Sequence, residues 1–226
     1  GQRSTTKARL VVVGNGMAGA RAVEEILARD GADLFDITVF GAEPYGNYNR
    51  ILLSNVLAGS DTADEIYLNP LDWYADNGLD LRAGVRVVRI DPYAHLVWAD
   101  DGTRMRYDKL ILATGSRSFF PPMEGLWADD TTLTDGVFGF RTIDDCSAIV
   151  DAAGQRSKAV VIGGGLLGLE AARGLQSRGL TVDVVHAAPT LMEAQLDSTA
   201  GGILRRSLDR IGIGVHVEKI TTGIHT

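Results

Sequence analysis

Residues 9–19 read RLVVVGNGMAG, an apolar run followed by three closely spaced glycines. The β-branched run predicts a buried strand, and the segment from Gly19 to about Arg29 has the pattern of a helix. A second β-branched run follows at 36–40. A strand, a glycine turn, a helix and another strand form a βαβ unit, whose parallel strands are buried on both faces.

Residues 158–168, KAVVIGGGLLG, repeat this pattern, with a helix predicted to about Arg178 and a strand at 180–185. Between the two copies, residues 79–112 read as short strands with turn signals, which predicts an antiparallel meander. The sequence therefore predicts an α/β protein with two Rossmann-like βαβ units and an antiparallel β-meander.

The chain divides at a Pro-Pro pair and an Asp/Thr-rich stretch near 121–135. We expect a first domain at 1–125, a connection at 126–157 and a second domain at 158–226. The second domain continues with a predicted helix at 199–210 and a strand at 214–220. In the first half the chain continues through a meander to Gly115, and the second half has no counterpart of these elements. The second unit therefore looks truncated. We expect either a fragment of a longer protein or an abbreviated second lobe.

Composition excludes several classes of protein. Of 226 residues, 45% are hydrophobic and 23% are charged, which is typical of a folded protein. The net charge of −7 argues against nucleic acid or an anionic membrane as the main partner. The single cysteine, Cys146, excludes a disulfide framework, a Cys-x-x-Cys pair and a cysteine-held metal cluster. No signal peptide or membrane span is recognisable, which indicates a cytoplasmic protein.

Gly14, Gly16 and Gly19 form the Gly-x-Gly-x-x-Gly dinucleotide fingerprint between a strand and a helix. The first glycine makes the turn, the second admits a pyrophosphate, and the third lets helix and strand pack closely. Glu43 lies near the position of the acid that holds a ribose diol. Such loops also occur without dinucleotides, as in methyltransferases.

Gly163, Gly165 and Gly168 form a second fingerprint, so a protein that binds two dinucleotides is the simplest interpretation. The second strand ends at His186, where an acid would favour NAD and an arginine NADP, so the choice stays open. Glu170 either faces the nicotinamide or only caps and solvates the first helical turn.

Two more stretches are candidates for ligand contacts. Residues 110–115, LILATG, predict a buried strand that ends in a small-residue turn, where a ligand can approach the backbone or where the strand simply ends. In the loop after Glu43, Arg50 could bind phosphate while Tyr45 or Tyr48 stacks on a ring. A solvated arginine beside packing tyrosines is the alternative.

These residues resemble the flavin-dependent pyridine-nucleotide oxidoreductases of the rubredoxin and ferredoxin reductase type. Within that family the chain is most similar to the FAD-containing N-terminal region of the large subunit of assimilatory NAD(P)H nitrite reductases. The resemblance covers nearly the whole chain and rests on VVGNGMAG (12–19), VFGAEP (39–44), NYNRILLS (47–54), LDWY (71–74), ATGS (113–116), VIGGGLLGLE (161–170) and PTLMEAQLD (189–197).

The resemblance implies an FAD site and an NAD(P)H site. The FAD residues would be Gly14, Gly16, Met17, Ala18, Gly19, Glu43, Arg50, Ser54, Val87, Ala113, Thr114, Gly115 and Arg141. The NAD(P)H residues would be Gly163, Gly165, Leu166, Leu167, Gly168 and Glu170. Asn55 stands where related reductases often carry a lysine, and the family's late Gly-Asp motif is absent from these 226 residues. A lysine-assisted flavin step is therefore in doubt, and FAD could bind weakly or not at all to this piece.

The implied chemistry is hydride transfer from NAD(P)H to the flavin, for which no catalytic side chain is assigned. Loop 45–55 has no redox cysteine, so electrons would leave for a metal centre, a partner protein or oxygen. Siroheme and an iron–sulfur cluster are expected only outside this chain. Alternatives are a standalone rubredoxin or ferredoxin reductase and a non-catalytic nucleotide-binding module, and a homo-oligomer is among the assemblies considered. We expect a structural role for Cys146, structural or surface roles for His95, His186, His216 and His225, and core or interface positions for Trp73, Trp98 and Trp127.

Overall fold

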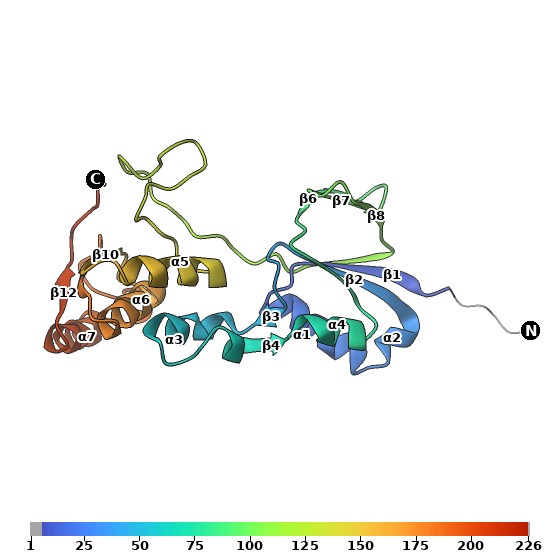
Figure 1. Ribbon diagram of the computed structural model, residues 1–226, viewed down its shortest axis with the longest axis horizontal. Helices are drawn as coiled ribbons and strands as arrows, with labels where there is room; N and C mark the ends of the chain where they lie inside the picture. The colour runs from blue at the N-terminus through green and yellow to red at the C-terminus, as the bar shows by residue number, and fades with distance from the viewer. Residues whose placement is uncertain (1–5, 226) are drawn as a thin grey trace, which may run out of the picture. The chain divides into compact units, whose positions relative to one another are not determined.

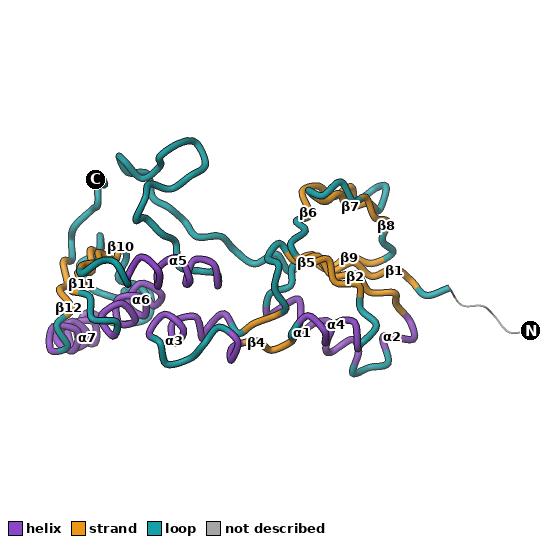
Figure 2. The backbone as a smooth tube through the Cα atoms, in the orientation of Figure 1, coloured by secondary structure: helices purple, strands orange, loops and turns teal. Residues whose placement is uncertain are grey.

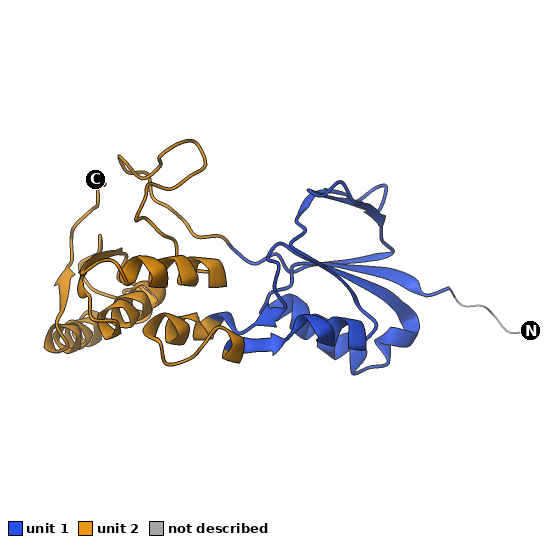
Figure 3. Ribbon diagram, viewed as in Figure 1, with its two compact units in different colours: residues 1–50, 66–116 blue, residues 51–65, 117–226 orange. Residues whose placement is uncertain are grey.

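The computed structural model describes residues 6–225 and contains two compact units (Figure 3). Unit 1 comprises residues 1–50 and 66–116, and unit 2 comprises 51–65 and 117–226. These units are defined by contacts alone, so the domain boundaries expected after residues 125 and 157 stay a prediction. The mixed α/β class with two parallel sheets is confirmed.

Unit 1 is built on a four-stranded sheet in which every pairing is parallel. In spatial order its strands are β5 (Asp80–Ala83), β2 (Phe35–Gly41), β1 (Ala8–Val13) and β9 (Lys109–Leu112). Successive side chains of β1 point to opposite sides of the sheet. Because Leu10–Val13 are all buried, the strand is covered on both faces. Leu10 and Val12 pack with Val23 and Tyr74 in one cluster, while Val11 and Val13 belong to another.

Helices cover one face of this sheet and an antiparallel meander covers the other (Figure 1). The helices are α1 (Met17–Leu27), α2 (Gly31–Leu34) and α4 (Leu71–Asp76). The meander consists of β6 (Val87–Asp91), β7 (Leu96–Ala99) and β8 (Arg104–Arg106). A short antiparallel pair, β3 (Asn47–Tyr48) with β4 (Tyr67–Asn69), completes the unit, and the 3-10 turn η1 (Arg50–Leu52) begins at its last residue before unit 2.

The predicted meander at 79–112 was too long. Its first segment, β5, pairs parallel with β2, and its last, β9, pairs parallel with β1. Only the three strands between them are antiparallel. Short strands bounded by turns look alike in sequence whichever sheet they join, so the pairing partner decided their direction.

Unit 2 contains a three-stranded parallel sheet and the helices around it (Figure 2). The strands are β10 (Lys158–Ile162), β11 (Thr181–Val185) and β12 (Ile213–His216). The helices are α3 (Leu53–Ala58), α5 (Ile143–Ala153), α6 (Leu166–Ser177), α7 (Ser198–Arg210) and the 3-10 turn η2 (Asp64–Ile66) at the unit boundary. Beyond His216, Glu218 has φ 54° and the strand stops, so the predicted strand at 214–220 was too long.

Helix α3 packs on α6 and α5, although its sequence lies far from both. Gly174 of α6 makes this approach close, because a Cβ there would lie 2.9 Å from Leu57 Cγ. At the end of α3, Arg178 donates from its guanidinium to the carbonyl oxygens of Leu57 and Val56. Both carbonyls lie in the last turn of α3, where carbonyl oxygens lack the usual partner four residues later, and Val56 O also accepts from Gly59 N–H at 3.1 Å.

The expectation that the apolar strands are buried on both faces was wrong at two places. In β10, Val160 is 64% exposed and Ile162 is 44% exposed. In β9, predicted as a buried strand, Leu112 is 60% exposed. Both strands lie at an edge of their described sheets. An apolar run predicts a strand, but burial depends on what covers it.

Candidate nucleotide-binding sites

The first glycine loop joins β1 to α1 at the carboxyl end of the sheet. Gly14 has φ 113°, a conformation that favours glycine, and a Cβ there would lie 2.1 Å from Ala113 O. A Cβ at Gly19 would lie 2.1 Å from Gly14 O, so this glycine lets the helix reach the loop. At Gly16, by contrast, a Cβ would meet nothing within 4 Å. The middle glycine therefore faces open space, as a pyrophosphate cradle requires.

Helix α1 begins beside this open space. Gly16 is its N-cap and no side chain caps the helix, so its first N–H groups have no side-chain partner. Such groups carry the partial positive charge that attracts phosphate. Met17 and Ala18 open the helix, and Ala113, just after β9, lies against the loop. The structure thus brings together the predicted residues Gly14, Gly16–Gly19 and Ala113, with Thr114 and Gly115 directly following.

Glu43 lies just beyond β2 and contacts two residues that follow it in the chain, Tyr48 and Arg50. Its Oε2 accepts a hydrogen bond from the Tyr48 hydroxyl at 2.6 Å, and its Oε1 forms an ion pair with Arg50 Nη2 at 2.7 Å. The Arg50 guanidinium also lies 5.0 Å from the centre of the Tyr48 ring. Arg50 is therefore held against Glu43 and Tyr48, and the buried Tyr48 packs as the alternative expected. The phosphate contact of Arg50 stays a prediction. Each carboxylate oxygen retains a lone pair for a ribose hydroxyl.

The remaining predicted FAD residues are distributed over both units. Val87 begins β6, and just before it the N–H groups of Gly84 and Val85 donate to Glu43 O and Gly41 O. This keeps the start of the meander beside Glu43. Ser54 and Arg141 belong to unit 2, and their part in an FAD site stays a prediction.

A buried polar network beneath the first loop was missed by the sequence analysis. Asn15, between two of the glycines, accepts from the Tyr74 hydroxyl at its Oδ1 (2.6 Å) and from Asn47 Nδ2 at its carbonyl oxygen (3.2 Å). Asn69, 5% exposed, donates to Glu24 Oε1 at 2.8 Å nearby. Burial raises the pKa of the Tyr74 hydroxyl. A polar residue inside the glycine motif was the only available signal.

The second glycine loop joins β10 to α6 with nearly the same geometry. Gly163 again has φ 113°, and a Cβ at Gly168 would lie 2.0 Å from Gly163 O. A Cβ at Gly165 would meet nothing within 4 Å, and no side chain caps α6 there. One difference is that Gly163 itself has open space where Gly14 meets Ala113.

Three further predicted residues lie on the first turns of α6. Leu166 and Leu167 are about half exposed, at 55% and 51%. Glu170 is partly buried, a degree of exposure that is compatible with both of its proposed roles.

Cys146 is buried in α5, and burial raises the pKa of its thiol.

His186, at the end of β11, braces the second loop. Its Nδ1 accepts a hydrogen bond from Gly164 N–H at 3.0 Å, and its Nε2 lies 2.9 Å from Glu193 Oε2. His186 therefore has a structural role in holding the second loop. His216 lies on β12, and its Nε2 is 2.8 Å from Asp183 Oδ1 on the neighbouring strand β11. Within residues 6–225, no three His, Cys, Asp or Glu side chains are grouped as metal ligands.

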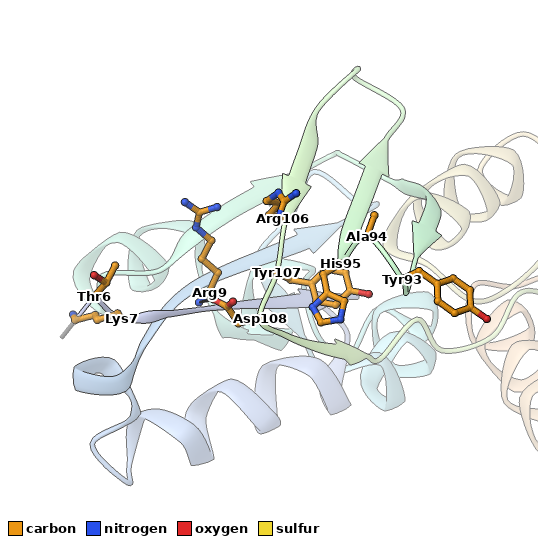
Figure 4. Close-up of a pocket in the computed structure, with 9 residues that line it drawn as sticks. All are labelled: Thr6, Lys7, Arg9, Tyr93, Ala94, His95, Arg106, Tyr107 and Asp108. Atoms are coloured by element: carbon orange, nitrogen blue, oxygen red, sulfur yellow. Dashed lines mark hydrogen bonds between the residues drawn. The ribbon is translucent and has the colours of Figure 1, made fainter.

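A separate pocket of about 560 Å³ lies at the opposite end of β1 (Figure 4). Its lining includes Lys7, Arg9, His95, Arg106, Tyr107 and Asp108. The His95 and Tyr107 rings stack at 5.4 Å, and Asp108 accepts a hydrogen bond from Arg9 N–H. None of the predicted site residues lines this pocket.

Comparison with known proteins agrees with the geometry of the two loops. The family model described as pyridine nucleotide-disulphide oxidoreductase matches residues 8–226. The chain therefore belongs to that family, as its resemblance implied. No helix among residues 6–225 is both long enough and apolar enough to cross a membrane.

Within the family, the chain is similar to nitrite reductases. It is 50% identical over 218 residues to the nitrite reductase [NAD(P)H] of Bacillus subtilis (strain 168), covering 96% of this chain and 26% of that protein. It is 39% identical over 219 residues to the nitrite reductase (NADH) large subunit of Escherichia coli (strain K12), covering 97% and 25%. The chain thus spans about a quarter of the length of these relatives.

A solved structure supports the fold. The NADH:rubredoxin oxidoreductase from Clostridium acetobutylicum superposes with a TM-score of 0.83 at 27% identity, covering 98% of this chain and 58% of that one.

Proposed function

We propose that this chain is the NAD(P)H-oxidising FAD module of a nitrite reductase. It would accept electrons from NAD(P)H and pass them to siroheme and an iron–sulfur cluster that other residues hold. The support is the pair of glycine loops together with relatives that are named nitrite reductases. A cytoplasmic location is part of the proposal.

The observation that carries it is the matching geometry of the two loops. In each, a carbonyl oxygen lies about 2 Å from the point that a Cβ on the third glycine would occupy, while the middle glycine faces open space. In each, a helix without a side-chain cap begins at that middle glycine. Two such cradles fit two pyrophosphates, which is what an enzyme using FAD and NAD(P)H needs.

The residues would then have the following tasks. The open side of Gly16 and the first N–H groups of α1 would hold the FAD pyrophosphate, with Glu43 at the adenosine ribose. Arg50 would orient Glu43 and offset its charge. The corresponding open side of Gly165 would hold NAD(P)H. Bound FAD supplies the hydride acceptor and can release electrons one at a time, so the protein needs to supply orientation and exclusion of water.

A second candidate is a standalone reductase of the rubredoxin type. The NADH-rubredoxin oxidoreductase of Clostridium acetobutylicum is 30% identical over 208 residues, covering 92% of this chain and 52% of that protein. The rest of the gene separates the two candidates. Cysteine ligands for an iron–sulfur cluster in the same protein or its partner subunit favour the nitrite reductase module, and their absence favours the standalone reductase.

The test is the visible absorption spectrum of the purified protein with FAD, before and after anaerobic addition of NADH or NADPH. We expect the flavin to bind and to bleach on addition of one of them. In the protein at the full length of its gene, with its siroheme and iron–sulfur cluster, bleaching followed by reoxidation with nitrite supports the full proposal. Bound flavin that neither nucleotide reduces would leave only a nucleotide-binding module.

A further inference from the structure

Gly164 is enclosed by the segment that follows β11. Its N–H donates to His186 Nδ1, and its carbonyl oxygen accepts from Met192 N–H at 3.0 Å. A Cβ at this position would lie 2.4 Å from Leu191 Cδ2. The segment from His186 to Glu193 is therefore tied directly to the second glycine loop.

The hydrogen bonds of His186 define its tautomer. Because Nδ1 accepts from Gly164, a neutral ring carries its proton on Nε2 and donates it to Glu193 Oε2. The His186 side chain is only 11% exposed. With both nitrogens engaged, His186 has no donor left for a ligand phosphate.

Glu193 presents a carboxylate close to the loop. Its side chain is 49% exposed, and one of its oxygens, Oε2, accepts the hydrogen bond from His186 Nε2. A hydrogen bond from its own backbone N–H and a second from His186 lower the pKa of the carboxyl group. The group is therefore negatively charged at neutral pH and has lone pairs that face solvent.

We propose that Glu193, oriented by His186, receives the adenosine ribose diol of the nicotinamide nucleotide and makes this site prefer NADH over NADPH. This rests on the proposed function. In the dinucleotide fold an acid at the end of the second strand accepts from the ribose hydroxyls. Here that position holds His186, and the tertiary structure supplies the acid from seven residues later. A 2′-phosphate would bring like charges together, which selects against NADPH.

Flavin reduction by NADH and by NADPH tests this in the protein at the full length of its gene. Glu193→Gln keeps the shape but removes the charge. We expect the KM for NADH to rise about tenfold, the size expected for a lost hydrogen bond to a charged group. We expect kcat at saturating NADH to stay unchanged and the preference over NADPH to shrink.

His186→Asn separates positioning from folding. An asparagine oxygen can replace Nδ1 as the acceptor for Gly164, but the side chain cannot reach Glu193. We expect it to retain thermal stability and NADPH binding while it raises the KM for NADH. Asp209→Asn, which removes a charge at an exposed position of α7, is the matched control and should change neither KM.

The outcomes distinguish this proposal from the one on which it rests. If NADH reduces the flavin and both Glu193→Gln and His186→Asn keep the wild-type preference for NADH over NADPH, the role of Glu193 is overturned and the proposed function stands. A wild-type preference for NADPH overturns the role of Glu193 as well. A flavin that neither nucleotide reduces in the wild type overturns the proposed function and the role of Glu193 with it.

Discussion

The hydroxyl of Tyr74 donates a hydrogen bond to Asn15 Oδ1 at 2.6 Å, joining α4 to the first glycine loop across 59 positions of sequence. Tyr74 is 1% exposed and Asn15 is partly buried, so the contact is largely shielded from solvent. Buried polar side chains, and not the glycines alone, therefore fix the position of the loop that is proposed to bind FAD.

Tyr74→Phe should destabilise the protein by about 1–3 kcal/mol, because Asn15 Oδ1 would lose its donor in a buried site. Urea unfolding measures this, and the FAD dissociation constant should rise in parallel. Tyr93→Phe, at a side chain 98% exposed, is the control and should have no effect. Equal midpoints for the two variants would show that the hydrogen bond contributes nothing.

Gly16→Ala and Gly19→Ala should fail in different ways. The Cβ at Gly16 meets open space, so that variant should fold normally but bind FAD poorly. The Cβ at Gly19 would lie 2.1 Å from Gly14 O, so that variant should lower the melting temperature. Thermal melts of the apoprotein and FAD titrations separate the two effects. A normally stable Gly19→Ala variant would contradict the close approach.

The same contrast is expected in the second loop, where Gly165 and Gly168 take the corresponding places. Gly165→Ala should leave the melting temperature and the FAD affinity unchanged but weaken binding of NADH. Gly168→Ala should instead reduce stability. Loss of FAD binding in Gly165→Ala would show that the second loop does not serve a separate nucleotide.

Arg178→Ala should loosen α3 from the rest of unit 2, because the guanidinium donates to two carbonyl oxygens at the end of that helix. We expect a loss of about 1 kcal/mol, the size of a typical net hydrogen bond. Limited proteolysis should then cut within 51–65 sooner. Arg206→Ala, at an exposed position of α7, should leave that cleavage rate unchanged.

Stability should fall at alkaline pH partly through Cys146. Burial raises the pKa of its thiol above the ordinary value of a cysteine, so the folded state keeps the proton longer than the unfolded state. The resulting stabilisation is complete below the unfolded-state pKa and is lost as pH rises through the folded-state pKa. Cys146→Ala should flatten the alkaline part of the stability curve measured by urea unfolding. An unchanged slope would exclude Cys146 as its source.

Much of the fold followed from local patterns. The two strand–glycine–helix–strand repeats appear in the structure within a few residues of their predicted limits, since β-branched runs and glycine turns act over short distances. The tight turn at Gly14 and the close packing at Gly19 were likewise readable from spacing, whereas the pyrophosphate contact at Gly16 stays a prediction. These features depend on the backbone near each residue.

Strand pairing, burial and the contacts made where loops fold back were decided only by the tertiary structure. Strand direction at β5 and β9, the exposure of Val160 and the pairing of Arg50 with Glu43 all required knowing which segments meet. The acid at the second loop is the clearest case. The sequence places His186 at the strand end, but a turn through Met192 brings the Glu193 carboxylate to that histidine. Periodicity and spacing report on neighbours along the chain, whereas side-chain hydrogen bonds form between groups that only folding brings together.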